Sequence, residues 1–196
     1  MRVAIVKYNA GNIQSVKFAL NRLGVEEPTL TDDPEIIRSA DKVIFPGQGE
    51  ASSAMRSLHE AGLVDVLKNL TQPFLGVCLG MQLMCAHSEE NNTECIGIIP
   101  EKVLRFPKEP GIKVPHMGWN NIYDLKSPIF GGIEEDEYIY FVHSYYVPRC
   151  AETIAKCDYV MPFSAAIQKD NFFAVQAHPE KSADTGMKIL ENFLKL

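Results

Sequence analysis

Cys78 is the residue of this chain whose surroundings most clearly indicate chemistry. It stands in Gly76-Val77-Cys78-Leu79-Gly80, after the apolar run Pro73-Phe74-Leu75 and before the helix-like stretch 81–84. A strand that turns sharply into a helix, with small residues beside a nucleophile, is typical of a nucleophile elbow. The glycines allow a cramped turn without a Cβ clash. The free N–H groups and positive dipole end of the following helix favour a thiolate, so the pattern predicts a catalytic cysteine.

A catalytic thiol needs a base, and the base needs an orienting group. His178 follows the strand-like run 172–176 and belongs to His178-Pro179-Glu180. Proline fixes φ and keeps the chain extended, which can place His178 and Glu180 on the same side. The alternative is a histidine at a strand end beside a surface glutamate. The presence of an elbow cysteine favours the catalytic interpretation.

The other four histidines have weaker contexts. His59 and His87 lie in helical, polar surroundings, which predicts surface positions. His116 and His143 lie in unusual motifs and are expected to be structural or interface residues. None of the four is therefore preferred as the base.

Acyl transfer also needs N–H donors directed at the developing oxyanion. One is expected to be the N–H of Leu79, directly after the nucleophile. The second can come from Pro46-Gly47-Gln48-Gly49, where the glycines allow a peptide at Gln48 to rotate and turn its N–H inward. The alternative for this segment is a plain tight turn, because proline and glycine are common in turns.

The size and charge of the chain limit what it can do. Its 196 residues suit one domain, residues 1–196, with a full hydrophobic core. The net charge is -6 and no basic stripe occurs, which argues against nucleic acid or an anionic membrane as the main partner. No apolar stretch approaches the roughly 20 residues that a membrane span needs. The N-terminus reads as a first strand rather than a signal peptide.

The five cysteines are irregularly spaced and contain no Cys-x-x-Cys pair. This spacing predicts neither a zinc site nor a disulfide framework. A reducing, cytoplasmic setting is the simplest interpretation.

The elements that must position these residues change character along the chain. In the first half, strands are expected at 2–7, 42–45 and 74–77, and helices at 12–23 and 62–70, with Asn12 as an N-cap. Alternating strands and helices predict a parallel sheet covered on both faces. In the second half, closely spaced strands are expected at 103–106, 138–142, 145–148, 153–157, 165–168 and 172–176, before a last helix at 184–194. Loops at the carboxyl ends of parallel strands form ligand sites, and both Gln48 and Cys78 fall there.

Taken together, these residues resemble the class I, triad-type glutamine amidotransferases. The matching segments are Pro46-Gly47-Gln48-Gly49, Gly76-Val77-Cys78-Leu79-Gly80-Met81-Gln82 and His178-Pro179-Glu180, in matching order and spacing. The resemblance implies a flavodoxin-like α/β fold, with a central largely parallel sheet, helices on both faces and added antiparallel strands. It also implies hydrolysis of glutamine to glutamate and ammonia.

Several families of that class share the triad, so other segments of the sequence must indicate which family this chain resembles. Lys113-Val114-Pro115-His116-Met117-Gly118-Trp119-Asn120 resembles the signature of the glutaminase subunits of imidazole glycerol phosphate synthases. The segments 8–12, 140–146 and 178–182 fit the same family. Two positions depart from its pattern. Gln48 stands where an apolar residue is more usual, and Ala177 where a bulky aromatic is common, but neither departure removes a catalytic group.

The resemblance implies five substrate-binding residues: Gly47, Gln82, Glu90, Ser144 and Tyr145. Glu90 suits the α-amino group of glutamine, and donors near Ser144 and Tyr145 suit its carboxylate. The alternative for Glu90 is a solvated charge beside Glu89, and for Tyr145 a packed strand residue. No metal or organic cofactor is needed for this hydrolysis.

The same resemblance implies a heterodimer with a (β/α)8-barrel cyclase subunit, which receives the ammonia. The expected interface residues are Asn12, Pro115, Met117, Trp119, Asn120 and Lys181. Trp119 is the only tryptophan, and an exposed tryptophan is a natural interface anchor. The alternative for Trp119 is a core aromatic.

Two other functions stay open at this point. The nearest is a glutaminase for a different synthase, such as one making pyridoxal phosphate or anthranilate, against which the segment 115–120 argues. The more distant is a protein of the same fold that uses a reactive thiol as a peptidase, or in binding or a stress response. Such proteins need not carry His178-Pro179-Glu180.

Overall fold

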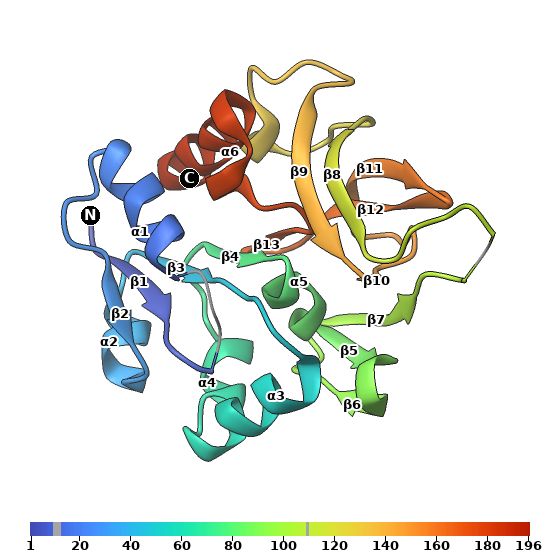
Figure 1. The fold of residues 1–196 in the computed structure, drawn as a ribbon. Helices are drawn as coiled ribbons and strands as arrows, with labels where there is room; N and C mark the ends of the chain where they lie inside the picture. The colour runs from blue at the N-terminus through green and yellow to red at the C-terminus, as the bar shows by residue number, and fades with distance from the viewer. Residues whose placement is uncertain (10–12, 109) are drawn as a thin grey trace.

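A seven-stranded sheet forms the centre of the computed structural model, which describes residues 1–9, 13–108 and 110–196 (Figure 1). Its strand order is β11-β12-β13-β4-β3-β1-β2. The bounds are β1 (Val3–Val6), β2 (Thr29–Thr31), β3 (Lys42–Phe45), β4 (Phe74–Val77), β11 (Thr153–Tyr159), β12 (Met161–Lys169) and β13 (Phe172–Val175). The strands from β13 to β2 pair in parallel, and β11 and β12 extend the sheet antiparallel.

Helices cover both faces of this sheet. They are α1 (Ile13–Arg22), α2 (Pro34–Ser39), α3 (Ala51–Glu60), α4 (Val64–Lys68), α5 (Leu79–Met84) and α6 (Ala183–Lys195). Successive strand residues point to opposite faces, so Val3 and Ile5 join α1 and α6 in one core cluster. Ala4 and Val6 pack with residues of helices α2, α3, α4 and α5 in the other cluster. Because both faces are buried, β1, β3, β4 and β13 are buried along their whole length.

Two smaller sheets lie beside the central one. A four-stranded sheet has the order β10-β7-β5-β6, and β8 pairs with β9 in a two-stranded ribbon. The bounds are β5 (Cys85–Ser88), β6 (Thr93–Glu94), β7 (Ile99–Arg105), β8 (His116–Asn121), β9 (Tyr138–His143) and β10 (Tyr145–Tyr146). Short 3-10 turns occur at η1 (Glu90–Asn92), η2 (Pro128–Phe130) and η3 (Pro179–Lys181). The expected antiparallel additions are therefore present.

Some elements differ from the sequence-based expectation. The expected helix 62–70 is shorter, at Val64–Lys68, and α2, α3, β2, β5, β6 and β8 were not expected. His87 lies half-buried in β5, not in helical surroundings, because α5 ends at Met84 and the chain then pairs with β7. His59 is exposed, as expected. Asn12, the expected N-cap, lies outside the described residues.

In the part of the chain that the structure describes, no helix has both the length and the apolar composition to cross a membrane.

Candidate active site

Cys78 occupies the junction between β4 and α5. Its backbone has φ 53° and ψ -107°, and its N–H donates to Val175 O at 2.8 Å. A positive φ at a residue with a side chain is strained by about 1–3 kcal/mol and persists where the surrounding structure enforces it, often at active sites. The strain therefore falls on the nucleophile itself, as an elbow requires.

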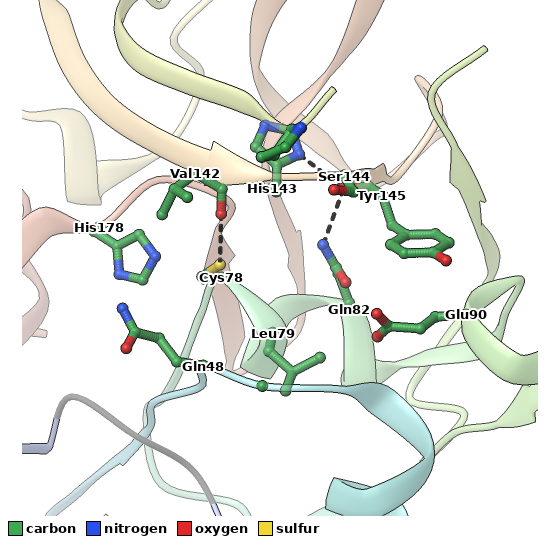
Figure 2. Close-up of a pocket in the computed structure, with 12 residues that line it drawn as sticks. Gln48, Cys78, Leu79, Gln82, Glu90, Val142, His143, Ser144, Tyr145 and His178 are labelled. Carbon is green, nitrogen blue, oxygen red and sulfur yellow. Dashed lines mark hydrogen bonds between the residues drawn. The ribbon is translucent and has the colours of Figure 1, made fainter. Parts of the chain in front are cut away.

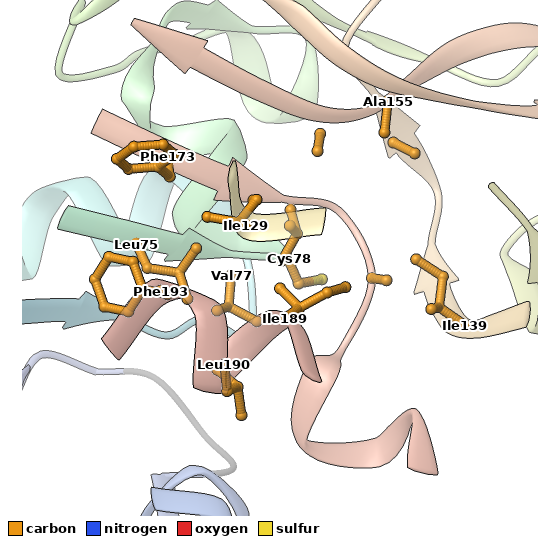
Figure 3. Packing of buried hydrophobic residues seen from close by; sticks show 14 of the residues in the cluster. Leu75, Val77, Cys78, Ile129, Ile139, Ala155, Phe173, Ile189, Leu190 and Phe193 are labelled. Atoms are coloured by element: carbon orange, nitrogen blue, oxygen red, sulfur yellow. The ribbon is translucent and has the colours of Figure 1, made fainter. Parts of the chain in front are cut away.

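The flanking glycines are needed because the chain segments approach closely. A Cβ on Gly80 would lie 2.0 Å from Phe45 O, and one on Gly76 would lie 2.6 Å from Met84 Sδ. Behind the elbow, Leu75 and Val77 belong to the same buried cluster as Ile189, Leu190 and Phe193 of α6 (Figure 3). The close packing of α5 against β3 and β4 fixes the position of the sulfur.

The predicted base and its orienting carboxylate lie in contact. His178 Nδ1 is 2.8 Å from Glu180 Oε1, and both side chains are 2% exposed. The ring is directed toward Cys78 (Figure 2), and its Nε2 has no other hydrogen-bond partner among the described residues. The surface position considered for Glu180 is therefore wrong. The η3 turn, beginning at Pro179, brings this carboxylate to the Nδ1 side of the imidazole.

The electrostatic setting favours a protonated His178. Burial alone would lower the pKa of His178, but the neighbouring Cys78 sulfur and the Glu180 carboxylate outweigh it and raise this pKa to about 10. The arrangement suits an imidazolium beside a thiolate, with the proton on Nε2 available to a leaving group.

Ser182 holds the base in place and was not anticipated from the sequence. Its Oγ donates to His178 O at 2.7 Å and accepts from Tyr140 N at 2.9 Å, and the residue is fully buried. His178 N donates in turn to Tyr140 O at 2.9 Å. β9 therefore fixes the His-Pro-Glu turn through Tyr140. The serine four residues after a catalytic histidine is the only sequence signal for this role.

A cavity of about 330 Å³ opens beside the sulfur. Cys78, Leu79, His178 and Gln48 line it together with four of the five predicted substrate-binding residues, Gln82, Glu90, Ser144 and Tyr145 (Figure 2). The volume is at the lower end of the range for small-ligand sites. Gly47 does not line this cavity and lies below it, against the elbow.

One carboxylate oxygen of Glu90 accepts a backbone hydrogen bond. Its Oε2 accepts from Ala51 N at 2.7 Å, at the start of α3. Burial raises the pKa of Glu90, although the Ala51 hydrogen bond opposes that shift. The residue is half-buried in the cavity wall, unlike the solvated charge considered as its alternative.

Gln82 joins a buried amide network that sequence reasoning did not foresee. Its Nε2 donates to Tyr145 O at 3.0 Å and to Gln176 Oε1 at 3.0 Å. Gln176 is fully buried, and its Nε2 donates to Cys78 Sγ at 3.6 Å. The thiol also contacts Val142 O at 3.8 Å. Gln176 lies two residues before His178, but a glutamine at the end of a strand carries no distinctive signal.

The loop 46–49 is anchored at its start and open at its end. Tyr8 Oη donates to Pro46 O at 2.5 Å, and burial, together with the charge of Cys78, raises the pKa of Tyr8. A Cβ on Gly47 would lie 2.7 Å from Gly80 N and Leu79 Cβ. Gly49 has φ 131°, a conformation that side chains disfavour, with open space around it. The loop is therefore closely packed at Gly47 and has open space beyond Gln48, at Gly49.

We expect Gly47→Ala to reduce glutamine hydrolysis by about 10²-fold, the effect of losing one oxyanion donor, because the methyl group pushes the loop off the elbow. Steady-state glutamate production should show the fall mainly in kcat. Gly131→Ala is the matched control, since its Cβ would come no closer than 3.3 Å to Pro128 O. Equal activities of the two variants would contradict this reading of Gly47.

Two of the predicted interface residues, Met117 and Trp119, are exposed on strand β8. Met117 is 63% exposed and Trp119 51%, and Trp119 packs edge-on against Tyr140 at a ring-centroid distance of 6.0 Å. The core position considered for Trp119 is therefore wrong. Pro115 is exposed at the cavity rim, Lys181 is exposed, and Asn120 is half-buried with its Nδ2 on Asp158 O at 2.9 Å.

His116 and His143 have a structural role, one of the two roles expected for them. They are 4% and 5% exposed and face each other across the ribbon, with Nδ1 of His116 3.1 Å from Nε2 of His143. Burial lowers the pKa of His116 to about 4 and that of His143 to about 3. Both rings are therefore neutral near pH 7.

One group of side chains among the described residues has the spacing of a metal site: Glu101, Cys150 and Glu152. It lies outside the cavity at Cys78. Burial raises the pKa of Cys150, and a protonated thiol is a poor metal ligand.

Ala177, the second departure from the family pattern, is buried in the core.

Comparison with known proteins defines first the class and then the family. A family model described as glutamine amidotransferase class-I matches residues 5–196. Among the solved structures that match over the whole chain is one described as a glutamine amidotransferase, with a TM-score of 0.76 at 17% identity. Another is a glutamine amidotransferase from Thermotoga maritima, with a TM-score of 0.64 at 15% identity. At these identities they support the fold alone. The match covers 98% of the first solved chain and 83% of the second.

The sequence relatives are much more similar. Imidazole glycerol phosphate synthase subunit HisH of Bacteroides thetaiotaomicron is 58% identical, and its counterpart in Escherichia coli K12 is 47% identical, each with full coverage of both chains. The chain therefore belongs to the class-I glutamine amidotransferases and, within that class, to the family of imidazole glycerol phosphate synthase HisH subunits.

Proposed function

We propose that residues 1–196 act as a single glutamine amidotransferase domain in which Cys78 attacks the side-chain carboxamide of glutamine. The thiolate forms a bond to the carboxamide carbon, and His178 Nε2 gives its proton to the departing ammonia. The resulting γ-glutamyl thioester is hydrolysed by a water that returns a proton to His178. Glutamate leaves and the thiolate is restored. The observation that carries this proposal is the buried contact between His178 and Glu180, directed at a strained elbow cysteine.

The tetrahedral oxyanion needs two donors. The first N–H of α5, at Leu79, has no acceptor within its own helix, and its position directly after Cys78 suits it to donate to the oxyanion. The second donor is the peptide N–H of Gln48, which Gly47 and Gly49 flank. Support for this role comes from the anchoring of Pro46 and Gly47, which leaves Gln48 as the movable part of the loop.

Glutamine would bind along the far wall of the cavity. The free oxygen of Glu90 faces the α-ammonium group, and donors near Ser144 and Tyr145 face the α-carboxylate. Gln82 contacts the substrate through its Oε1, because its Nε2 is already engaged by Tyr145 O and Gln176. This orientation brings the carboxamide to Cys78.

The ammonia would pass to a (β/α)8-barrel cyclase subunit. We propose that this cyclase uses it, with N′-(phosphoribulosylformimino)-aminoimidazole carboxamide ribotide, to make imidazole glycerol phosphate and aminoimidazole carboxamide ribotide. The relatives are named as subunits of imidazole glycerol phosphate synthase, which supports such a partner. The exposed Met117 and Trp119, with Pro115, Asn120, Lys181 and Asn12, would form the contact surface.

Release of free ammonia would waste glutamine, so the isolated chain should be nearly inactive. In our proposal the Gln48 peptide faces away from the oxyanion until the partner binds, and partner binding favours the competent orientation. If the free chain hydrolysed glutamine as fast as its complex with cyclase and nucleotide, the loop would not be a switch.

We expect Trp119→Ala to weaken cyclase binding by about 30-fold, the effect of losing an interface residue worth about 2 kcal/mol. Because the side chain is half exposed, the fold should not change. Titration of cyclase while glutamate is measured gives the affinity. Ile36→Ala on α2, which removes another exposed apolar side chain, is the control and should bind as the unchanged protein does. Equal affinities of the two variants would remove Trp119 from the interface.

The proposal as a whole is tested by mixing the chain with a cyclase subunit and glutamine, with and without the nucleotide, and measuring glutamate. Formation of glutamate only in the complex supports it. A glutamine-competitive chloroketone gives a second test, because labelling of Cys78 that glutamine does not block would indicate a redox or binding thiol. Activation by a different synthase would point to the other glutaminase role.

A further inference from the structure

Gln176 lies between the end of β13 and His178, and the proposed hydrolysis of glutamine at Cys78 assigns it no step. It is fully buried, and its Nε2 is 3.6 Å from Cys78 Sγ. A buried amide at this position must satisfy its own donors and acceptor. The question is which end of the amide faces the sulfur.

The hydrogen bonds of the neighbouring groups answer it. Tyr145 O is a carbonyl oxygen and can only accept, so the end of Gln82 that lies 3.0 Å from it is the NH₂ group. The same NH₂ lies 3.0 Å from Gln176, so that end of Gln176 is its oxygen. The NH₂ of Gln176 therefore faces Cys78. The sulfur receives a donor, and a thiolate accepts such a bond better than a thiol does.

The Tyr145 carbonyl is itself fixed from the other side. His143 Nδ1 lies 2.7 Å from it and must carry a hydrogen, which leaves His143 Nε2 to accept from His116 Nδ1 at 3.1 Å. Asn120 Nδ2 lies 3.4 Å from the remaining nitrogen of His116. The low pKa values of both histidines keep the rings neutral, so each has one donor and one acceptor. Every hydrogen bond from Asn120 to the sulfur thus has a defined direction.

We propose that Gln176 is a positioning residue that donates a hydrogen bond to the Cys78 thiolate, in an orientation that Gln82 and the Tyr145 carbonyl impose. The inference rests on the proposed role of Cys78 as nucleophile. Since Gln82 and Tyr145 also line the substrate cavity, the same amides that meet glutamine determine the direction of the donor at the sulfur.

Other titratable groups act on this sulfur and must stay constant in a test. His178 is directed at it, with Glu180 behind the imidazole, and Tyr8 lies below the loop 46–49. His143 and Glu90 stand in the cavity wall. None of these is changed by a substitution at Gln176, so a shift in the titration of Cys78 reports the amide.

The test is the pH dependence of Cys78 alkylation by iodoacetamide in the full chain, with the labelled peptide quantified by mass spectrometry. For Gln176→Met we expect the midpoint to rise by about one pH unit, and the rate below the midpoint to fall about tenfold. Gln176→Glu should raise it further, because a carboxylate then faces the thiolate. Gln168→Met is the matched control. Gln168 lies in β12, where its amide oxygen accepts from Ser127 Oγ, and its replacement should leave the midpoint unchanged.

Gln82→Met keeps the test decisive if either Gln176 variant does not fold. It leaves the Gln176 amide in place but frees its orientation, so a smaller rise is expected. A lowered melting temperature with an unchanged midpoint, in Gln176→Met or in Gln82→Met, would overturn the inference and leave the amides a purely structural role. The alkylation needs no glutamine or cyclase. A failure of the proposed glutaminase activity would therefore appear separately, as absence of glutamate.

Discussion

Cys78→Ala is expected to abolish glutamine-dependent synthesis by the complex with cyclase, while synthesis from added ammonium salts continues. Loss of a covalent nucleophile should lower kcat by at least about 10⁴-fold, since the remaining donors cannot replace bond formation at sulfur. The ammonia-dependent reaction needs only the cyclase site and an intact interface. Parallel assays with glutamine and with ammonium, each following the cyclase product, separate the two effects.

The other cysteines provide a control for this result. Burial raises the pKa of Cys95 to about 12, so its thiol is unreactive near neutral pH. Cys95→Ala should keep both the glutamine-dependent and the ammonia-dependent reactions. If Cys78→Ala retained glutamine-dependent synthesis, Cys78 would not be the nucleophile. Loss of both reactions would instead mean that the substitution had disturbed the complex with cyclase.

The elbow could be predicted from the sequence because its chemistry lies within a few adjacent residues. Cys78 stands between two glycines, and no other residue type could fill the space that α5, β3 and β4 leave at Gly76 and Gly80. The same holds for His178 and Glu180, where one proline sets the spacing. Such local constraints are visible in a single sequence.

Features that depend on tertiary pairing could not be predicted. β8 contains few residues with high strand propensity and forms because its backbone pairs with β9, from His116 opposite His143 to Asn121 opposite Tyr138. Helix α3 was missed, although its buried residues Ala51, Ala54, Met55 and Leu58 follow helical spacing. Two of these four residues are alanines, and the pattern lies next to the glycine-containing loop 46–49.

The amide network shows the same limit within the site. Gln176 and Gln82 are 94 positions apart, and each is an ordinary polar residue in the sequence. Their meeting depends on β13 lying beside β4, with Val175 opposite Val77. Burial makes the hydrogen bond obligatory, and burial is a property of the whole fold.

Glu180→Gln is expected to lower kcat for glutamine by about 10³- to 10⁴-fold, with little change in folding. The amide is the same size as the carboxylate, but it can present an N–H to His178 Nδ1 and favour the wrong tautomer. The neutral amide also no longer stabilises the imidazolium that protonates the leaving ammonia. Single-turnover measurements with the cyclase complex should place the loss in formation of the thioester.

The pH dependence distinguishes this electrostatic role from simple positioning. Cys78 and Glu180 outweigh burial and hold the pKa of His178 at about 10, so the acid form persists at neutral pH and is lost as the pH rises through that value. Removing the Glu180 charge lowers the pKa of His178, and the alkaline fall in kcat must then begin at a lower pH. Profiles of kcat against pH, supported by NMR titration of the histidine ring, measure this shift.

Glu191→Gln is the control for the loss of one negative charge. Glu191 is on the surface of α6, paired with Lys188 and Lys195, and such exposed pairs contribute little. Its alkaline limit should match that of the unchanged protein. An unmoved limit in Glu180→Gln would mean that the carboxylate only orients the ring. A shift toward higher pH would be incompatible with a carboxylate that stabilises the imidazolium, and the thiolate–imidazolium pair would then have to draw its stability from elsewhere in the site.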